Sequence, residues 1–230
     1  MKKIGIIGGL GPESTIDYYK RIIAFFHHQN QSFSTPEIIV YSVDMAEMFS
    51  MLTEQRWEAL TEWLAGKVTA LKNAGADFAV ISSNTPHVVF DQLVAQSSLP
   101  LISIVTATLE SAQAMGLKKV GLLGTGFTMQ TNFFGESFAK KGIAVVVPNT
   151  QEQHYIQDKL FTEIELGIFT DETRQGLLAI VDTMKNRDGI EAVILGCTEL
   201  PLILDMDGSV VPFLNTAAIH VDAICKRCMQ

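Results

Sequence analysis

The chain has 230 residues, of which 47% are hydrophobic and 18% charged, enough apolar side chains for a packed core. Its 17 Lys and Arg against 25 Asp and Glu give a net charge of −8, which disfavours binding to an anionic phosphate backbone. No apolar stretch reaches the roughly 20 residues that a membrane span needs, and the glycine-broken residues 1–9 do not resemble a signal peptide. We therefore expect a soluble, cytoplasmic protein that binds neither nucleic acid nor membranes.

Short runs rich in Ile and Val alternate with longer helical patterns along the chain. Most of these runs lack a strict apolar/polar alternation, which is typical of strands buried on both faces of a parallel sheet. The predicted strands are residues 3–7, 37–41, 78–82, 101–104, 120–124, 144–147, 192–195 and 210–213. The predicted helices are residues 13–29, 55–74, 88–97, 107–115, 128–141, 152–166, 171–187 and 215–229. This alternation predicts an α/β fold with mostly parallel sheets flanked by helices.

Two motifs occur twice at nearly equal intervals. Ile6–Gly11 resembles Leu122–Phe127, and Ile81–Thr85 resembles Leu195–Glu199. The repeat predicts two pseudo-symmetric domains, residues 1–103 plus 212–230 and residues 104–211, with the last strand and helix returning to the first domain. If the two domains face each other, Ser83 and Cys197 occupy equivalent strand ends on opposite walls of a cleft.

The glycine-rich turn Gly8–Pro12 does not fit a dinucleotide-binding fingerprint. No register gives the three required glycines, and the acidic residue expected about 20 positions later is missing. The turn is interpreted either as a cradle of backbone N–H groups for a small anion such as a carboxylate, or as a tight turn without a ligand.

Polar side chains directly follow two of the buried runs. Ser83–His87 bring hydroxyl, amide and imidazole groups to one strand end, and Cys197–Glu199 bring a thiol, a hydroxyl and a carboxylate to its counterpart. Polar groups in such places are costly unless they have a role, so they indicate a site. A thiol has a pKa of about 8.5, which a helix start can lower, so it could take a proton from a carbon acid and return it.

These motifs together resemble the aspartate/glutamate/hydantoin racemase superfamily, and most closely its cofactor-independent aspartate racemase branch. The resemblance rests on Ile4–Thr15, Ser83–His87, Leu123–Thr128 and Gly196–Glu199, and it extends to Thr216–His220. It implies an active site in the cleft between two domains, a small amino-acid substrate, no pyridoxal phosphate or other cofactor, and often a homodimer. In this family two facing cysteines transfer the α-proton, one on each face of the substrate.

The resemblance makes Cys197 one catalytic residue and places Ser83 at the position of the other. It also implies that seven residues hold the substrate's carboxylate and amine. These are Leu10, through its backbone, with Asn84, Thr85, Thr125, Thr128, Thr198 and Glu199. His87 and His220 are expected to lie behind the site, and no cluster has the spacing of a metal site.

The chain departs from the family pattern at Leu10, which replaces the more usual methionine and is a tolerable change if its backbone supplies the contact. It also departs at three positions that bear on its chemistry. Ser83 replaces the usual cysteine, either natively or by an engineered change, and an unactivated hydroxyl is a far poorer base than a thiol. Met48 and Leu166 stand where members that bind acidic side chains often have arginine and lysine.

The departures at Met48 and Leu166 leave the substrate open. Aspartate or glutamate is the default that the resemblance implies, and a neutral or apolar amino acid is the alternative. Arg56, Lys159 and Arg174 are the nearby cations that could compensate for the missing ones.

Two other functions remain open. One is a decarboxylase of the same superfamily, which uses a single cysteine at the second position to protonate an enolate. The other is a non-catalytic amino-acid-binding protein that lost its chemistry with the first cysteine. Cys225 and Cys228 form a lone C-x-x-C pair, interpreted as two structural thiols of a terminal helix.

Overall fold

The computed structural model describes residues 1–204 and 208–230. The chain divides into two compact units, residues 1–107 with 217–230, and residues 108–216. Each unit contains a four-stranded parallel sheet with helices around it. The predicted fold class, two α/β domains built on parallel sheets, is confirmed.

The first unit has the strand order β2-β1-β3-β4. Its strands are β1 (Ile4–Gly8), β2 (Ile38–Ser42), β3 (Phe78–Ile81) and β4 (Leu101–Ile102). Its helices are α1 (Pro12–Asn30), α2 (Met45–Thr53), α3 (Trp57–Asn73), the short 3-10 helix η1 (Thr85–Val89), α4 (Phe90–Gln96) and α10 (Thr216–Cys228). Helix α5 (Ile104–Ala114) begins in this unit and continues into the second.

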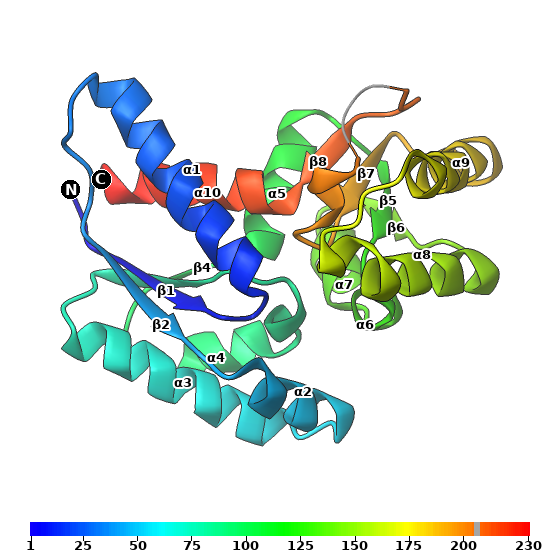
Figure 1. The fold of residues 1–230 in the computed structure, drawn as a ribbon. Helices are drawn as coiled ribbons and strands as arrows, with labels where there is room; N and C mark the ends of the chain where they lie inside the picture. Colours follow the sequence, from blue (N-terminus) through cyan, green and yellow to red (C-terminus); the bar gives the residue numbers. More distant parts are fainter. Residues whose placement is uncertain (205–207) are drawn as a thin grey trace. The chain divides into compact units, whose positions relative to one another are not determined.

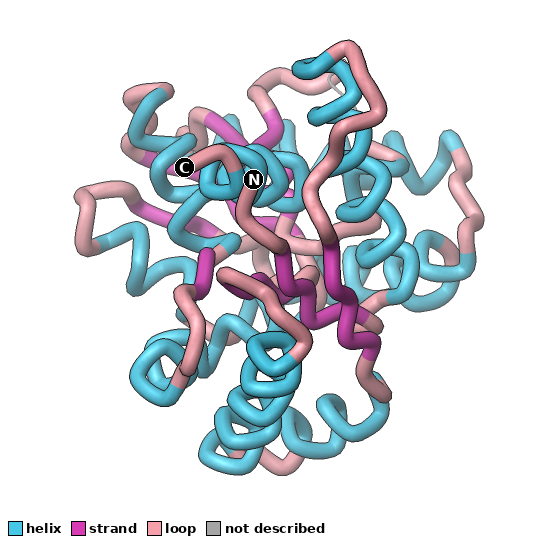
Figure 2. The backbone as a smooth tube through the Cα atoms, turned by 90° about the vertical axis from the view of Figure 1, so that its left-hand side faces the viewer, coloured by secondary structure: helices cyan, strands magenta, loops and turns pink. Residues whose placement is uncertain are grey.

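The core of the first unit explains why β1 and β3 are almost wholly apolar. Both strands are buried along their length, with α1 and α10 on one face of the sheet and α3 and α4 on the other (Figure 1). Tyr18, Ile22 and Phe26 of α1 pack with Val221 and Ile224 of α10 against the strands. The chain ends lie side by side (Figure 2), where the Lys2 N–H donates to the carbonyl of Cys228. Cys225 and Cys228 are buried free thiols of α10.

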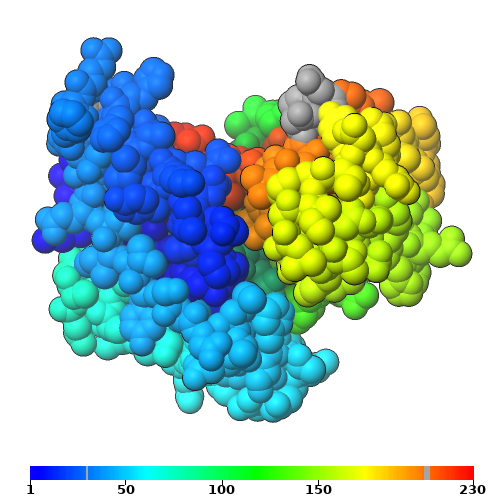
Figure 3. Space-filling model, viewed as in Figure 1, coloured from blue at the N-terminus to red at the C-terminus, as the bar shows by residue number. Residues whose placement is uncertain are grey.

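The second unit has the strand order β6-β5-β7-β8. Its strands are β5 (Lys119–Leu123), β6 (Ala144–Val146), β7 (Ala192–Leu195) and β8 (Phe213–Asn215). Its helices are α6 (Gly126–Gln130), α7 (Phe133–Ala139), α8 (Thr150–Thr162), η2 (Ile164–Leu166), α9 (Asp171–Asp188) and η3 (Leu200–Leu202). In the space-filling view, side chains fill the spaces between neighbouring helices within each unit (Figure 3).

The two sheets repeat one plan. In each, the first strand along the chain pairs with the next two strands, and the fourth strand extends the sheet. The last paired residues are Ile7 with Ile81 in one unit and Leu123 with Leu195 in the other. The next residue repeats as well, since the Ser82 N–H donates to the Ile7 carbonyl at 3.0 Å and the Gly196 N–H to the Leu123 carbonyl at 2.6 Å.

Three sequence-based expectations about the elements are wrong. The last strand does not return to the first unit, because β8 pairs with β7 and the Thr216 hydroxyl fixes its end to the Leu195 carbonyl at 2.8 Å. Only α10 returns. The helix expected over 128–141 is two helices, because Thr131 has extended backbone. Helix α2, capped by the Asp44 side chain, was not expected at all. Among the described residues, no helix is both long and apolar enough to span a bilayer.

Candidate active site

The turn between β1 and α1 is closed by the side chain of Thr15. Gly9 has a φ of +80°, and its N–H donates to Thr15 Oγ1 at 2.9 Å. A side chain at Gly8 would place its Cβ 2.5 Å from Thr15 Cγ2, so only glycine fits there. Because a hydroxyl of the chain accepts the Gly9 N–H, this group does not contribute to an anion cradle. Leu10, expected to contact substrate through its backbone, has a buried side chain at this turn.

Three hydroxyl groups join this turn to the end of β3. Thr15 Oγ1 lies 3.2 Å from Ser82 Oγ, and the Ser14 hydroxyl donates to the Ser82 carbonyl at 2.9 Å. Ser14 and Ser82 are buried, so these bonds fix the β3 end against the first turn of α1. These hydroxyls are not among the site residues predicted from the sequence. The signal for them was a pair of hydroxyl residues in a helix's first turn and a serine directly before Ser83.

The backbone fixed in this way carries Ser83 and Asn84. Both are buried, and Thr85, half-buried, opens η1. Pro86 stands in the first turn of η1, and the His87 N–H donates to the Asn84 carbonyl at 3.0 Å. The structure therefore places Leu10, Ser83 and Asn84 at the carboxyl ends of two neighbouring strands, as expected for a site in a parallel sheet.

His87 and His220 lie behind this turn. The Nε2 of His87 accepts the Ile104 N–H at 3.3 Å, and the ring stacks on Phe90. Burial lowers the pKa of His87 to about 3, with a smaller contribution from His220, while the carbonyls of Ser83 and Asn84 act the other way. Burial also lowers the pKa of His220 to about 4. Both rings are therefore neutral near pH 7.

In the second unit, Thr125 and Thr128 order the turn after β5. Thr125 Oγ1 caps α6 by accepting the Thr128 N–H at 3.3 Å, and the two hydroxyls lie 3.1 Å apart. Thr128 is fully buried against Gly124 and Gly196, where a Cβ on either glycine would approach its methyl group to 3.2 Å. The hydroxyls thus stand beside the backbone that leads to Cys197.

The Cys197 thiol is paired with a carboxylate. Its Sγ donates to Glu199 Oε2 at 2.9 Å, and the Thr198 hydroxyl donates to the same oxygen at 3.0 Å. Burial raises the pKa of Cys197 well above its usual range, and the negative charge of Glu199 adds to this shift. The resting group is therefore a thiol, a proton donor next to a carboxylate that can accept its proton. A helix start, which can lower a thiol pKa, does not do so here, because desolvation and the carboxylate dominate.

Comparison with known proteins decides the family. The sequence model of the Asp/Glu/hydantoin racemase family matches residues 7–224. The chain belongs to this family. The broad specificity amino-acid racemase RacX of Bacillus subtilis is 22% identical over 220 residues, covering 94% of this chain and 93% of that protein.

Two solved structures resemble the chain over its full length. An aspartate racemase homologue from Pyrococcus horikoshii OT3 is 36% identical, with a TM-score of 0.90 and 100% of both chains covered. A protein from Yersinia pestis, provisionally described as an Asp/Glu racemase, is 33% identical, with a TM-score of 0.93 and the same coverage. These likenesses agree with the family assignment and with the two-unit fold.

One further carboxylate emerges near the thiol of this racemase-family protein. Glu165 of η2 adds its negative charge to the raised pKa of Cys197. Partial desolvation, and then the charge of Glu199, raise the pKa of Glu165 itself. Glu165 is not among the residues predicted from the sequence, because the family pattern has its lysine at the neighbouring position, Leu166. Leu166 is 67% exposed.

Two of the three cations suggested as replacements for the family's arginine and lysine have other partners. Arg56 pairs with Glu54 at 2.7 Å, and Lys159 pairs with Glu163. Met48, at the arginine position, is buried in the first unit. No group of three or more His, Cys, Asp or Glu side chains within residues 1–204 and 208–230 could hold a metal ion.

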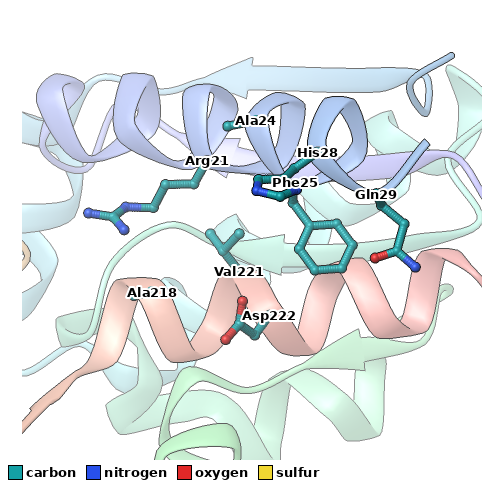
Figure 4. Close-up of a pocket in the computed structure, with 8 residues that line it drawn as sticks. All are labelled: Arg21, Ala24, Phe25, His28, Gln29, Ala218, Val221 and Asp222. Atoms are coloured by element: carbon teal, nitrogen blue, oxygen red, sulfur yellow. The ribbon is translucent and has the colours of Figure 1, made fainter. Parts of the chain in front are cut away.

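A separate cavity of about 450 Å³ lies between α1 and α10 (Figure 4). Phe25 and Val221 form its apolar part, and Arg21, which pairs with Asp17 at 2.5 Å, lies at its edge. None of its lining residues belongs to the predicted site. The predicted residues form two groups instead: Leu10, Ser83, Asn84, Thr85, His87 and His220 in the first unit, and Thr125, Thr128, Cys197, Thr198 and Glu199 in the second.

Proposed function

We propose that this chain is a cofactor-independent amino-acid racemase of the aspartate/glutamate type, which interconverts L and D enantiomers by α-proton transfer. The observation that carries the proposal is the hydrogen bond from Cys197 to Glu199 at a strand end of a racemase-family fold. Ser83 occupies the equivalent strand end of the other unit, and a cleft with one residue on each face of the substrate is part of the proposal.

On the Cys197 face, the chemistry follows from the thiol–carboxylate pair. The thiol gives its proton to the substrate carbanion, so that the S–H bond breaks, a C–H bond forms and a thiolate remains. In the reverse direction the thiolate takes the α-proton. Glu199 can accept the thiol proton to generate that thiolate, at a cost set by the raised pKa of Cys197.

On the Ser83 face, the hydroxyl lacks a comparable base. His87, a candidate helper, directs its Nε2 to the backbone of Ile104, and a neutral ring with a pKa of about 3 is a weak base. Proton transfer on this face therefore depends on the serine hydroxyl or on water. We expect the two enantiomers to exchange their α-protons at different rates, while the equilibrium between them is unchanged.

Aspartate and glutamate are the substrates that we propose first, supported by family membership and by the aspartate racemase homologue of Pyrococcus horikoshii. Two observations favour including neutral amino acids in the test. Arg56 and Lys159 are already in ion pairs, and Glu165 and Glu199 make the surroundings of Cys197 negative. A charged hydrogen bond to a substrate carboxylate is worth about 1.5–3 kcal/mol, so a missing cation weakens binding substantially.

The deciding experiment follows the α-proton by NMR in D₂O. L- and D-aspartate, glutamate, alanine and methionine are incubated with the wild type, with Ser83→Cys and with the control Ser32→Cys, which adds a thiol at an exposed serine. We expect loss of the α-proton signal with at least one amino acid, and about a hundredfold faster loss for Ser83→Cys alone. Tight binding of an amino acid without exchange in any variant would contradict racemisation and support a binding protein.

Decarboxylation is the second candidate, favoured by the presence of a single strand-end thiol whose raised pKa keeps it protonated. A decarboxylase of this kind needs only to protonate an enolate, which a thiol does directly. Release of carbon dioxide from a substituted malonate, lost in Cys197→Ala and unaffected by Ser83→Ala, would establish this reaction in place of racemisation.

We also propose that the enzyme is a cytoplasmic homodimer. The reducing cytoplasm suits a chain whose three cysteines are all free thiols, because the chemistry requires reduced Cys197. Exposed apolar side chains of β2 and α2, including Tyr41 and Phe49, are available for a second copy. Light scattering coupled to size exclusion gives the mass, and a monomer at micromolar concentration would contradict the dimer.

A further inference from the structure

The chain crosses between the two units twice. The first crossing follows residue 107, within α5, and the second precedes residue 217, at the start of α10. The segment Ile102–Ile104 leads into the first crossing, and His220 lies one helical turn after the second. Both connecting segments, Ile102–Ile104 and the start of α10, must be bonded to the rest of the first unit if the end of β3 is to keep a fixed position within that unit.

His220, near the start of α10, holds the segment Ile102–Ile104 in place. Its Nε2 lies 3.1 Å from the Ile102 carbonyl, and its Nδ1 lies 2.9 Å from the Tyr18 hydroxyl. A carbonyl can only accept, so Nε2 carries the proton and Nδ1 accepts from Tyr18. Both His220 and Tyr18 are fully buried, so one imidazole joins α1, α10 and β4.

His87 holds the same segment two residues further on, at Ile104, and its imidazole is the opposite tautomer. Its Nε2 accepts the Ile104 N–H at 3.3 Å, so the ring proton is on Nδ1. The ring is stacked on Phe90 with centroids 4.8 Å apart and meets the His220 ring edge-on at 6.4 Å. The backbone N–H of His87 donates to the Asn84 carbonyl at 3.0 Å, so the residue that holds Ile104 through its ring is also bonded to the turn that carries Asn84.

We propose that His87 and His220 form a single anchor that fixes both connecting segments to the first unit, and that His87 is a positioning residue for Ser83 and Asn84. Each imidazole satisfies a buried backbone group of the segment, one carbonyl and one N–H, which an apolar side chain could not do. The effect on catalysis rests on the proposed function, whereas the anchoring itself does not.

The test compares two substitutions of His87 that separate its hydrogen bond from its ring. His87→Gln keeps an acceptor that can reach the Ile104 N–H, and His87→Phe keeps the ring stacked on Phe90 without the acceptor. His154→Gln, a change at an exposed histidine of α8, is the control. Hydrogen exchange of residues 102–107 and the kcat and KM of α-proton exchange are measured for each.

We expect at least tenfold faster hydrogen exchange at residues 102–107 in His87→Phe, with a tenfold lower kcat and little change in KM. His87→Gln stays within about threefold of the wild type in each quantity. Equal behaviour of the two variants, or wild-type exchange in His87→Phe, overturns the proposal. If the wild type racemises nothing, the proposed function fails, and the hydrogen-exchange result still decides the anchor.

Two further measurements, which do not use His87→Phe, test the anchor if that variant does not fold. Nitrogen-15 NMR of the wild type should show His87 protonated at Nδ1 and His220 at Nε2, both neutral from pH 5.5 to 8. Tyr18→Phe removes only the hydroxyl that bonds His220, and should speed hydrogen exchange at residues 102–104 and 217–221 by about tenfold. The reverse tautomers, a charged ring, or unchanged exchange in Tyr18→Phe would each overturn the proposal.

Discussion

The strand ends of β3 and β7 have the same backbone and different proton chemistry. Ser83 and Cys197 are each the second residue after the last paired position of equivalent strands. Ser83 follows Ser82, whose hydroxyl lies 3.2 Å from that of Thr15, and precedes the neutral His87 by four residues, whereas Cys197 bonds a carboxylate. The comparison teaches that a duplicated fold conserves where a side chain stands, and that its neighbours decide whether it moves a proton.

The largest expected effect comes from removing the Cys197 thiol, the group that distinguishes the two strand ends. Cys197→Ala should lower α-proton exchange by about a thousandfold, because general acid–base groups typically contribute 10²–10⁴-fold. Ser83→Ala should lower it by less than about tenfold, because a serine without a base contributes little. Both rates are measured by NMR in D₂O, and equal losses in the two variants would mean that the two faces are equally competent.

Acid should weaken the first unit selectively, because His87 and His220 both belong to it and His154 of the second unit is exposed. The unfolded chain binds protons on these histidines near pH 6.5, and the folded chain only near pH 3 and 4. Stability is therefore full above pH 6.5 and falls as the pH is lowered toward 4. At pH 5 the loss is about 2 kcal/mol for each histidine, or about 4 kcal/mol together.

Tryptophan fluorescence measures this loss, since Trp57 and Trp63 both lie in α3 of the first unit. Urea unfolding at pH 7.5 and pH 5 gives the difference in free energy for the wild type and for His87→Gln. The variant should lose about half as much stability as the wild type. An identical pH dependence in both proteins would show that His87 does not resist protonation in the fold.

Alanine substitutions in the two glycine turns should destabilise the two units to different extents. A Cβ at Gly8 would lie 2.5 Å from Thr15 Cγ2, whereas one at Gly124 approaches Thr128 only to 3.2 Å. We expect Gly8→Ala to cost about 3 kcal/mol in the free energy of unfolding and Gly124→Ala about 1 kcal/mol. Adding Thr15→Ser to Gly8→Ala removes the clashing methyl and should recover part of the loss, and no recovery would place the clash elsewhere.

The smallest expected effect concerns the carboxylate that distinguishes the second strand end. Glu199→Gln removes the second-largest cause of the raised pKa of Cys197, so this pKa should fall toward its usual value while burial still holds it above. Alkylation of Cys197 by iodoacetamide near pH 8, followed by mass spectrometry, should be about tenfold faster in the variant. Glu165→Gln is the matched control, with a smaller increase because its contribution is the weakest. A slower reaction of Glu199→Gln would mean that proton acceptance by Glu199 outweighs the effect of its negative charge on the Cys197 thiolate.

Much of the fold could be predicted because buried parallel strands have a strong local signature. Ala192–Leu195 matches β7 at both ends, and the repeat of glycine turns correctly predicted two similar units. Helix α2 was missed because a short helix capped by Asp44 has too few turns for a clear periodicity. The membership of β8 could not be predicted, because three residues can pair with either sheet and only tertiary contacts decide.

The candidate site was predictable in its residue types and not in its electrostatics. The strand-end position of Cys197 follows from the run Ala192–Leu195, but the direction of its pKa shift depends on Glu199 turning back onto the sulfur. The roles of Thr15, Ser82 and Glu165 depend on contacts between distant segments, and the local sequence indicates at most which residue types are present. His87 and His220 were placed near the site, but their opposite tautomers require the positions of Ile102 and Ile104.

The return of α10 to the first unit has a consequence for biosynthesis. Residues 108–216 form one continuous segment, so the ribosome completes the second unit while the first still lacks its final helix. Until α10 emerges, only α1 packs on this face of β1 and β3, and the apolar surface that meets Val221 and Ile224 is uncovered. The nascent chain must therefore carry this partly open apolar surface while residues 108–216 are synthesised, and a nonsense codon before α10 would leave it exposed to chaperones and proteases.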